Sequence, residues 1–214
     1  MKKMIPGGFF ITFEGGEKAG KSTQIKLLAE RLKKLDYDVL ETREPGGTAF
    51  CEKLRHLVMN YKDEKIVPEA ELLLFGASRA QLVYTILRPH LQKGGIVLCD
   101  RFADSTTAYQ GEARGLDKKF IAEMHQFTIG KYKPNLTILL DLAPEESWKR
   151  QQQMVGTADD DRFEIETRLF HSAVREGFLE LAEKYPERIK LLDATLTVEQ
   201  LSESIWEKVQ NAIH

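Results

Sequence analysis

A short segment near the amino terminus constrains this chain more than any other feature. Residues 15–22 read Gly-Gly-Glu-Lys-Ala-Gly-Lys-Ser, which matches the phosphate-binding pattern G-x-x-x-x-G-K-[ST]. A β-rich run at 9–13 precedes the segment, and apolar residues at helical spacing follow it from Ile25 to about Leu35. Glycines let backbone N–H groups turn inward around phosphate oxygens, and the start of the following helix adds partial positive charge. The pattern therefore predicts a strand, a phosphate-binding loop and a helix.

The phosphate loop predicts what is bound but not what is done with it. Lys21 is expected to reach the β and γ phosphates of a nucleoside triphosphate, and the Ser22 hydroxyl to ligate Mg²⁺. GTPases, motor ATPases, sulfotransferases and small kinases all use such a loop. The alternative is a glycine-rich turn closed by a surface lysine, which would need a chance match in the correct strand–helix context. Function must therefore be argued from the rest of the chain.

Apolar runs alternate with helical patterns along the whole chain. The runs at 96–100 and 136–141 lack polar alternation, as strands buried on both faces do. This alternation predicts an α/β fold of the P-loop NTPase type, in which helices flank a central parallel five-stranded sheet in three layers. Residues 1–214 show no internal break and are expected to form a single domain. The candidate strands are 9–13, 39–42, 96–100, 136–141 and 188–192. The candidate helices are 25–35, 48–59, one that runs from Pro68 toward Pro89, 120–128, one that begins at about 144, one that ends at about 184, and 197–212.

Composition excludes several classes of protein and partner. The 214 residues carry 31 Lys+Arg and 33 Asp+Glu, and a formal charge of −2 does not favour broad binding to nucleic acid or an anionic membrane. Cys51 and Cys99 are isolated, so neither a zinc framework nor a disulfide scaffold is expected. Pro6 interrupts the start before any signal-peptide run, and no later run reaches the ~18 apolar residues of a membrane span. We expect a cytoplasmic protein with local anion sites, and no nucleic-acid or membrane partner.

Two pairs of residues could take part in a second-substrate site. Asp100 and Arg101 end the third candidate strand, where ligands bind in open α/β sheets. The carboxylate could orient Mg²⁺ or its waters and the arginine could clamp a phosphate, although a surface ion pair is the alternative. Phe75 and Arg79 are four residues apart and share one face of a predicted helix. A ring beside a fork of donors suits a nucleobase, although a core phenylalanine and a solvated arginine are the alternative.

Several ordered motifs extend over nearly the whole chain. They are 13–15 with the phosphate loop, Thr-Arg-Glu-Pro-Gly-Gly-Thr at 42–48, 71–75 continuing to 79–81, and 100–102 followed by Ser105 and 108–111. Together they give the chain a resemblance to the thymidylate kinase family, and 43–47 and 108–111 separate this family from adenylate and guanylate kinases. The resemblance implies transfer of the γ-phosphate of ATP to dTMP, giving dTDP for dTTP biosynthesis, with Mg²⁺ and in a homodimer.

The resemblance also implies where each part of dTMP binds. Phe75 would stack on thymine, Arg79 would hydrogen-bond its exocyclic oxygen, and Thr106 and Gln110 would contact the base edge. The sugar and the acceptor phosphate would meet a second set of residues: Tyr109 against C2′, Glu17 on the 3′-hydroxyl, and Arg43, Arg55 and Arg101 around the phosphate, with Glu44 beside them.

On the donor side, the resemblance implies that Arg150 packs on adenine. Ser22 and Asp100 are the expected Mg²⁺ residues. The other expected ATP-binding residues are those of the phosphate loop and the next residue: Gly15, Gly16, Glu17, Lys18, Ala19, Gly20, Lys21, Ser22 and Thr23.

The expected catalysis is electrostatic. A phosphate acceptor is already anionic near neutral pH, so no general base is needed and the five scattered histidines are not expected to be catalytic. Lys21, Arg101 and Mg²⁺ would neutralise charge on the transferring group. A lid that excludes water is expected at about 151–161, a small and acidic stretch between two helices.

This lid departs from a common bacterial pattern, in which several arginines follow the Lys-Arg pair. Here glutamines and a methionine occupy 151–154, whereas Lys18 stands at a loop position that is basic in the eukaryotic type. We therefore expect Lys18 to supply transition-state charge, with Arg162 as a second catalytic candidate. A solvated lysine at a loop tip is the alternative for Lys18.

Other functions and assemblies remain open at this stage. A different nucleotide or nucleoside kinase, acting for example on dUMP or dGMP, would share the architecture. A nucleotide-dependent switch is less consistent with the sequence, because the chain lacks an N-K-x-D guanine motif. The Leu-rich helix from 68 to 87 could bury one face against a second copy, or could pack entirely within its own domain.

Overall fold

The structure, a computed structural model, describes residues 2–61, 63–153, 163 and 166–213. Its centre is a sheet in which every neighbouring pair of strands is parallel, in the order β2-β3-β1-β4-β5. The predicted five-stranded parallel sheet is therefore confirmed. The strands are β1 (Phe9–Gly15), β2 (Val39–Arg43), β3 (Ile96–Asp100), β4 (Leu136–Asp141) and β5 (Ile189–Asp193).

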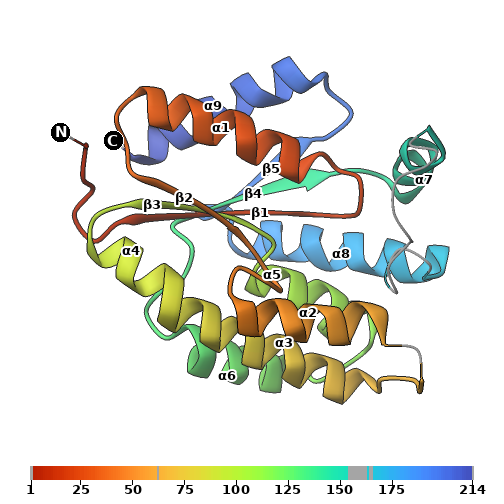
Figure 1. The fold of residues 1–214 in the computed structure, drawn as a ribbon. Coiled ribbons are helices and arrows are strands. Elements are labelled where there is room, and N and C mark those ends of the chain that lie inside the picture. The colour runs from red at the N-terminus through yellow and green to blue at the C-terminus, as the bar shows by residue number, and fades with distance from the viewer. Residues whose placement is uncertain (1, 62, 154–162, 164–165, 214) are drawn as a thin grey trace.

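Helices cover both faces of this sheet (Figure 1). One face carries α1 (Lys21–Lys34) and α9 (Val198–Ile213), whereas α7 (Pro144–Gln153) lies beyond the carboxyl end of β4. The other face carries α2 (Ala49–Asn60), α3 (Pro68–Leu82), α4 (Arg88–Gln92), α5 (Ala103–Thr106), α6 (Lys118–Ile129) and α8 (Arg168–Lys184). Two π-helical segments, η1 (Val83–Leu87) and η2 (Thr107–Ala113), continue α3 and α5. This arrangement gives the three layers that the sequence predicts.

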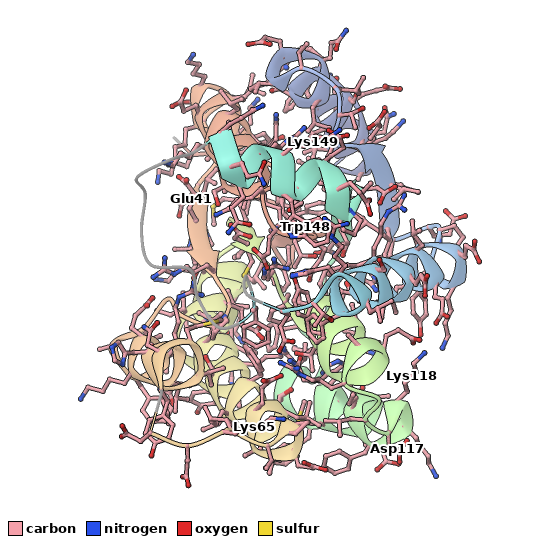
Figure 2. The ribbon with its side chains drawn as sticks, turned by 90° about the vertical axis from the view of Figure 1, so that its right-hand side faces the viewer. Glu41, Lys65, Asp117, Lys118, Trp148 and Lys149 are labelled. Atoms are coloured by element: carbon pink, nitrogen blue, oxygen red, sulfur yellow. The ribbon has the colours of Figure 1, made fainter. Side chains whose placement is uncertain are left out.

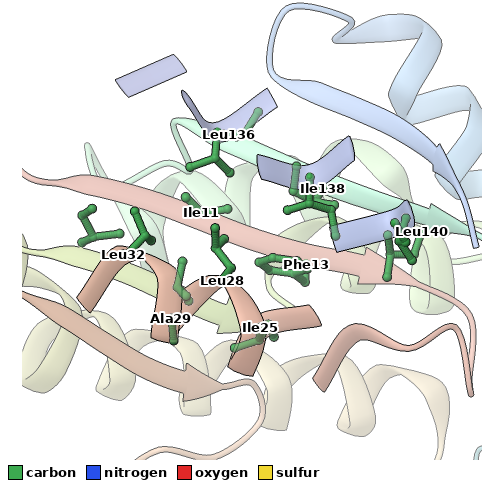
Figure 3. Packing of buried hydrophobic residues seen from close by; sticks show 14 of the residues in the cluster. Ile11, Phe13, Ile25, Leu28, Ala29, Leu32, Leu136, Ile138 and Leu140 are labelled. Atoms are coloured by element: carbon green, nitrogen blue, oxygen red, sulfur yellow. The ribbon is translucent and has the colours of Figure 1, made fainter. Parts of the chain in front are cut away.

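The central strand β1 is buried on both faces, as its apolar run requires. Figure 3 shows Ile11 and Phe13 facing Ile25 and Leu28 of α1, within one buried hydrophobic cluster. On the opposite face Phe10 packs edge-to-face against Phe102, with ring centroids 5.0 Å apart. Burial from both sides fixes the strand whose carboxyl end carries the phosphate loop.

Two helical predictions are incomplete. The helix that begins at Pro68 does run toward Pro89, but it passes through η1 and ends as α4 at Gln92. The helical segment formed by α5 and η2, residues 103–113, was not predicted. Its inward side chains include Asp104, Thr106 and Gln110, which are buried but polar, so the segment shows no apolar period. In the part of the chain that the structure describes, no helix has the length and apolar character of a membrane span.

Candidate active site

The phosphate loop occupies the turn between β1 and α1, as predicted. Gly15 has φ 131°, and a Cβ there would lie 2.3 Å from the carbonyl oxygen of Leu140, so only glycine fits. Gly20, with φ 94°, begins α1. The Lys21 ammonium lies across the loop and donates to the carbonyl oxygens of Gly16 (2.7 Å) and Gly15 (3.2 Å). Burial and the Arg101 guanidinium lower the pKa of Lys21 to about 8, and protonated Lys21 is the major form at neutral pH.

Ser22, at the start of α1, lies next to Asp100, at the carboxyl end of β3. The Ser22 hydroxyl donates to Asp100 Oδ2 over 2.7 Å. Hydroxyl and carboxylate oxygens are hard donors, which suit Mg²⁺ that keeps several waters and is shared with nucleotide phosphates. Within the described ranges, no group of three or more His, Cys, Asp or Glu side chains could hold a metal by itself. This donor set therefore fits a metal that arrives with its nucleotide.

A charged triad connects the phosphate loop to η2. Arg101 donates to Glu17 Oε1 (2.6 Å) and to the carbonyl oxygen of Gly15 (2.9 Å), and the Tyr109 hydroxyl donates to the same Glu17 oxygen (2.9 Å). Burial alone would raise the pKa of Glu17, but Arg101 and then Lys21 lower it to about 2. Glu17 is therefore an anion held between a guanidinium and a phenol. Arg101 itself adopts φ 64°, a left-handed conformation that directs its side chain back over the loop.

Two cavities meet at this triad. The donor cavity follows the phosphate loop from Glu17 to Thr23 and has a volume of about 590 Å³. The acceptor cavity, of about 90 Å³, is lined by aromatic rings and by Thr106 and Gln110. Glu17, Glu44, Arg55 and Arg101 line both cavities. The arrangement brings most of the predicted donor and acceptor residues to two adjoining spaces, whose shared boundary carries two carboxylates and two guanidinium groups.

Hydrogen bonds organise the inner end of the acceptor cavity. Phe75 lines it, and Gln110 donates its amide to the buried carboxylate of Glu71 over 2.7 Å, which directs its carbonyl oxygen elsewhere. Arg79 lies behind the lining rather than in it and is 0% exposed. Its guanidinium donates to both carboxylate oxygens of Glu44 and to Thr106 Oγ1, the latter over 2.6 Å. Arg79 therefore fixes two cavity residues from the inside.

The three predicted phosphate arginines are placed differently. Arg101 and Arg55 line the acceptor cavity, and Arg55 donates to the carbonyl oxygen of Pro45 over 3.2 Å. Arg43 lines only the donor cavity and is paired with Glu52 at 2.9 Å. Phe163, which sequence reasoning missed, also lines the acceptor cavity and packs against Phe75 with ring centroids 6.1 Å apart. It follows the acidic stretch, where nothing in the sequence predicts a buried ring.

The helix that leads into the predicted lid is hydrogen-bonded to the phosphate loop. Arg150 of α7 donates to the carbonyl oxygens of Lys18 (3.1 Å) and Ala194 (2.6 Å), and Ser147 donates to that of Glu17 (2.8 Å). Trp148 lies on the side of α7 nearer α8, whereas Lys149 lies on the opposite side (Figure 2). Lys18 and Arg150 both line the donor cavity. Arg162 and residues 154–161 of the lid lie outside the described residues.

Comparison with known proteins identifies the family. The sequence model of the thymidylate kinase family matches residues 13–205. A thymidylate kinase of Syntrophotalea carbinolica is 43% identical over 209 residues, covering 96% of this chain and 97% of the relative. One of Afipia carboxidovorans is 45% identical over 209 residues, covering 97% and 92%. The crystal structure of thymidylate kinase from Ehrlichia chaffeensis superposes with a TM-score of 0.77 at 33% identity, covering 96% and 99% of the two chains. This chain therefore belongs to the thymidylate kinase family and has its P-loop NTPase fold.

Proposed function

We propose that this member of the thymidylate kinase family phosphorylates dTMP to dTDP with the γ-phosphate of ATP, a step toward dTTP, by holding both nucleotides across one charged boundary. The observation that carries the proposal is that Glu17, Arg55 and Arg101 line the donor and acceptor cavities at once. A phosphoryl group that passes between two anions needs such a boundary, because transfer depends on positioning and on charge stabilisation.

The donor cavity holds the triphosphate of ATP. Backbone N–H groups of residues 15–20 and the amino end of α1 surround the phosphates, and Lys21 exchanges its carbonyl contacts for the β and γ phosphate oxygens. Ser22 and Asp100 would hold Mg²⁺ or its waters, and the ion would supply positive charge next to the phosphates. Thr23 lies at the same helix start, and Arg150, fixed by two carbonyl oxygens, packs on adenine.

The acceptor cavity holds dTMP with its base inward. Phe75 stacks on thymine, and Gln110 accepts from the ring N–H through its carbonyl oxygen, because its amide is already donated to Glu71. Thr106 contacts the base edge. Arg79 donates to Thr106 from behind the cavity lining, and we propose that it hydrogen-bonds the exocyclic oxygen only once dTMP has entered. In this arrangement Phe163, which packs on Phe75 and Tyr109, yields its place to the base.

The sugar and phosphate of dTMP lie at the shared boundary. Anionic Glu17 accepts from the 3′-hydroxyl, and the Tyr109 ring, oriented by its bond to Glu17, disfavours a ribose hydroxyl. Arg55 and Arg101 hold the acceptor phosphate, with Arg43 at the donor side and Glu44 beside them. Because this phosphate is already anionic, no side chain has to remove a proton from it.

Charge on the transferring group is stabilised by Lys21 and Arg101, and by Lys18 at the loop tip. Lys18 has φ 55°, and Arg150 holds its carbonyl oxygen, so the loop tip has a defined position at the donor cavity. In this proposal Arg162 is a second source of catalytic charge, and residues 151–161 form a lid. Both belong to a single domain that spans 1–214. Closure of the lid excludes water and limits hydrolysis of ATP.

We also propose a homodimer in the cytoplasm, formed through exposed apolar residues on α3, η1 and α6. Leu73 and Tyr84 are 56% and 69% exposed, and Phe120 and Phe127 on the adjacent helix α6 are 48% and 89% exposed. Large apolar side chains exposed on adjacent helices suit an interface between two copies. Light scattering is expected to give a dimer for the natural chain and a monomer for Phe127→Glu. Leu169→Glu, at an equally exposed site on α8, should stay dimeric.

A coupled assay for ADP release tests the proposed reaction. With ATP and Mg²⁺ fixed, dTMP is expected to give the highest kcat/KM in a panel with dUMP, dGMP and thymidine. A better acceptor elsewhere in the panel would assign the chain to another nucleotide or nucleoside kinase activity. Slow ATP hydrolysis that needs no acceptor would instead indicate a nucleotide-dependent switch.

A further inference from the structure

His125, on α6, lies next to the base end of the acceptor cavity and has no part in the proposed mechanism. It does not line that cavity. Its Nδ1 lies 3.0 Å from Arg79 Nη1, and its Nε2 lies 3.2 Å from Thr107 Oγ1. One imidazole therefore contacts α3 on one side and the start of η2 on the other.

The tautomer of this histidine follows from its partners. A guanidinium can only donate hydrogen bonds, so Nδ1 of His125 must accept from Arg79 and the ring proton must be on Nε2. Burial and then the Arg79 charge lower the pKa of His125 to about 2, which keeps the ring neutral. Nε2–H then donates to Thr107 Oγ1, and the Thr107 hydroxyl donates in turn to the carbonyl oxygen of Ala103 over 3.4 Å.

Both hydrogen-bond partners of His125 are connected to residues that line the acceptor cavity. Arg79 donates to Glu44 Oε2 (3.0 Å) and to Thr106 Oγ1 (2.6 Å), and both of these side chains line the cavity. Thr107 is the first residue of η2, the segment that carries Tyr109 and Gln110. The orientation of the guanidinium and the start of η2 are thus tied to one ring.

A different cavity borders this ring on another side. It has a volume of about 340 Å³, lies between α6 and α8, and is lined by His125 together with Gln126 and Leu181. A side chain that borders open space loses van der Waals partners there. The hydrogen bonds of the ring, with Arg79, Thr107 and the backbone of Ala103, therefore contribute to defining its position.

We propose that His125 is a positioning residue for the base end of the dTMP site. Through Nδ1 it orients Arg79, and so Thr106 and Glu44, and through Nε2 it fixes the start of η2. This inference rests on the proposed function, because it assigns thymine to the cavity that Thr106 and Gln110 line.

Substitutions that keep one arm of the imidazole at a time test the proposal. Asparagine places its carbonyl oxygen near the position of Nδ1, and glutamine reaches the position of Nε2. Relative to the natural chain, His125→Leu should raise KM for dTMP about 10-fold, the effect of one lost charged hydrogen bond, while KM for ATP changes less than about 2-fold. His125→Asn keeps the charged hydrogen bond with Arg79 and should keep KM for dTMP within about 3-fold. His125→Gln keeps only the neutral bond with Thr107 and should recover less than about 3-fold of the loss seen in His125→Leu. His56→Leu, on the exposed face of α2, is the matched control and should leave both constants unchanged.

The Kd of dTMP, measured by calorimetry without ATP, separates positioning from general damage. It should follow the KM series, while the urea midpoints of the Asn and Gln variants remain alike. The proposal is overturned if the Asn variant binds dTMP as weakly as the Leu variant, if Gln rather than Asn preserves binding, or if both substrates weaken equally. A natural chain that does not use dTMP would refute the proposed function itself, whatever the variants do.

Discussion

The donor and acceptor ends of the active site are built in opposite ways. The donor end is local: a loop of consecutive residues between β1 and α1, in which backbone groups and Lys21 face the phosphates. The acceptor end is assembled from α2, α3, α5, η2 and the turn after β2, and buried side chains hold one another in place. A backbone site tolerates changes in most side chains but depends on one lysine, whereas a side-chain network depends on each of its pairs.

The largest effect is expected at the donor end. Lys21→Ala should lower kcat by about 10³-fold, because it removes the buried positive charge that faces the transferring phosphate. KM for dTMP should stay within about 3-fold, since no acceptor group is touched. Steady-state kinetics with both substrates varied provides the measurement. Lys26→Ala, on the exposed face of the same helix, is the control, and an equal loss there would refute the assignment.

At the acceptor end the largest effect should be on stability. Arg79 and Glu44 form a buried ion pair, with Arg79 0% and Glu44 4% exposed. Arg79→Met leaves a buried carboxylate without its partner and should lower the free energy of unfolding by about 3 to 5 kcal/mol. Arg43→Met breaks an exposed pair with Glu52 and should cost less than about 1 kcal/mol. Urea denaturation compares the two, and equal losses would show that burial of the pair does not matter.

A buried carboxyl group near the end of β1 should titrate near neutral pH. Glu14 is buried at the end of β1 and accepts from Phe102 N (2.8 Å) and from the Ser105 hydroxyl (2.5 Å). Burial, and then repulsion from Asp104, raises the pKa of Glu14 to about 7 from an ordinary value of 4.5. The folded state therefore binds this proton more tightly than the unfolded state does.

Because the pKa of Glu14 is higher in the folded state than in the unfolded state, its proton stabilises the folded state. This stabilisation is complete below about pH 4.5 and is lost as pH rises toward 7. The loss is about 3 kcal/mol for this one group. Glu14→Gln can still accept from Phe102 N and can donate its amide to the Ser105 hydroxyl. It should remove that slope from urea midpoints measured between pH 5 and 7.5. Glu41→Gln, at an exposed pair with Lys33, should leave the slope unchanged. An unaltered slope in Glu14→Gln would assign the titration to another group.

The same contrast explains what the sequence could predict. The phosphate loop, the five parallel strands and the placement of Asp100 and Arg101 follow from local patterns, since each depends on neighbours in the chain. The helical segment 103–113 could not be predicted, because its buried side chains are polar and satisfied only by distant residues such as Arg79 and Arg188. For the same reason the sequence singles out Arg79 but does not predict that its side chain lies behind the cavity rather than in it.

The smallest effect, and the sharpest question about the donor end, concerns Lys18. If its ammonium stabilises the transferring group, Lys18→Ala should lower kcat by about 10- to 100-fold, with KM for ATP within about 3-fold, and Lys18→Arg should retain most of the turnover. Lys149→Ala removes an exposed lysine of α7 on the side away from Trp148 (Figure 2) and serves as the control. Arg162→Ala is the competing variant. Intact turnover in Lys18→Ala with turnover abolished in Arg162→Ala would move the catalytic charge from the loop to the lid. Reduced turnover in Lys18→Ala with intact turnover in Arg162→Ala would show that loop residues supply both the phosphate site and the charge that transfer requires.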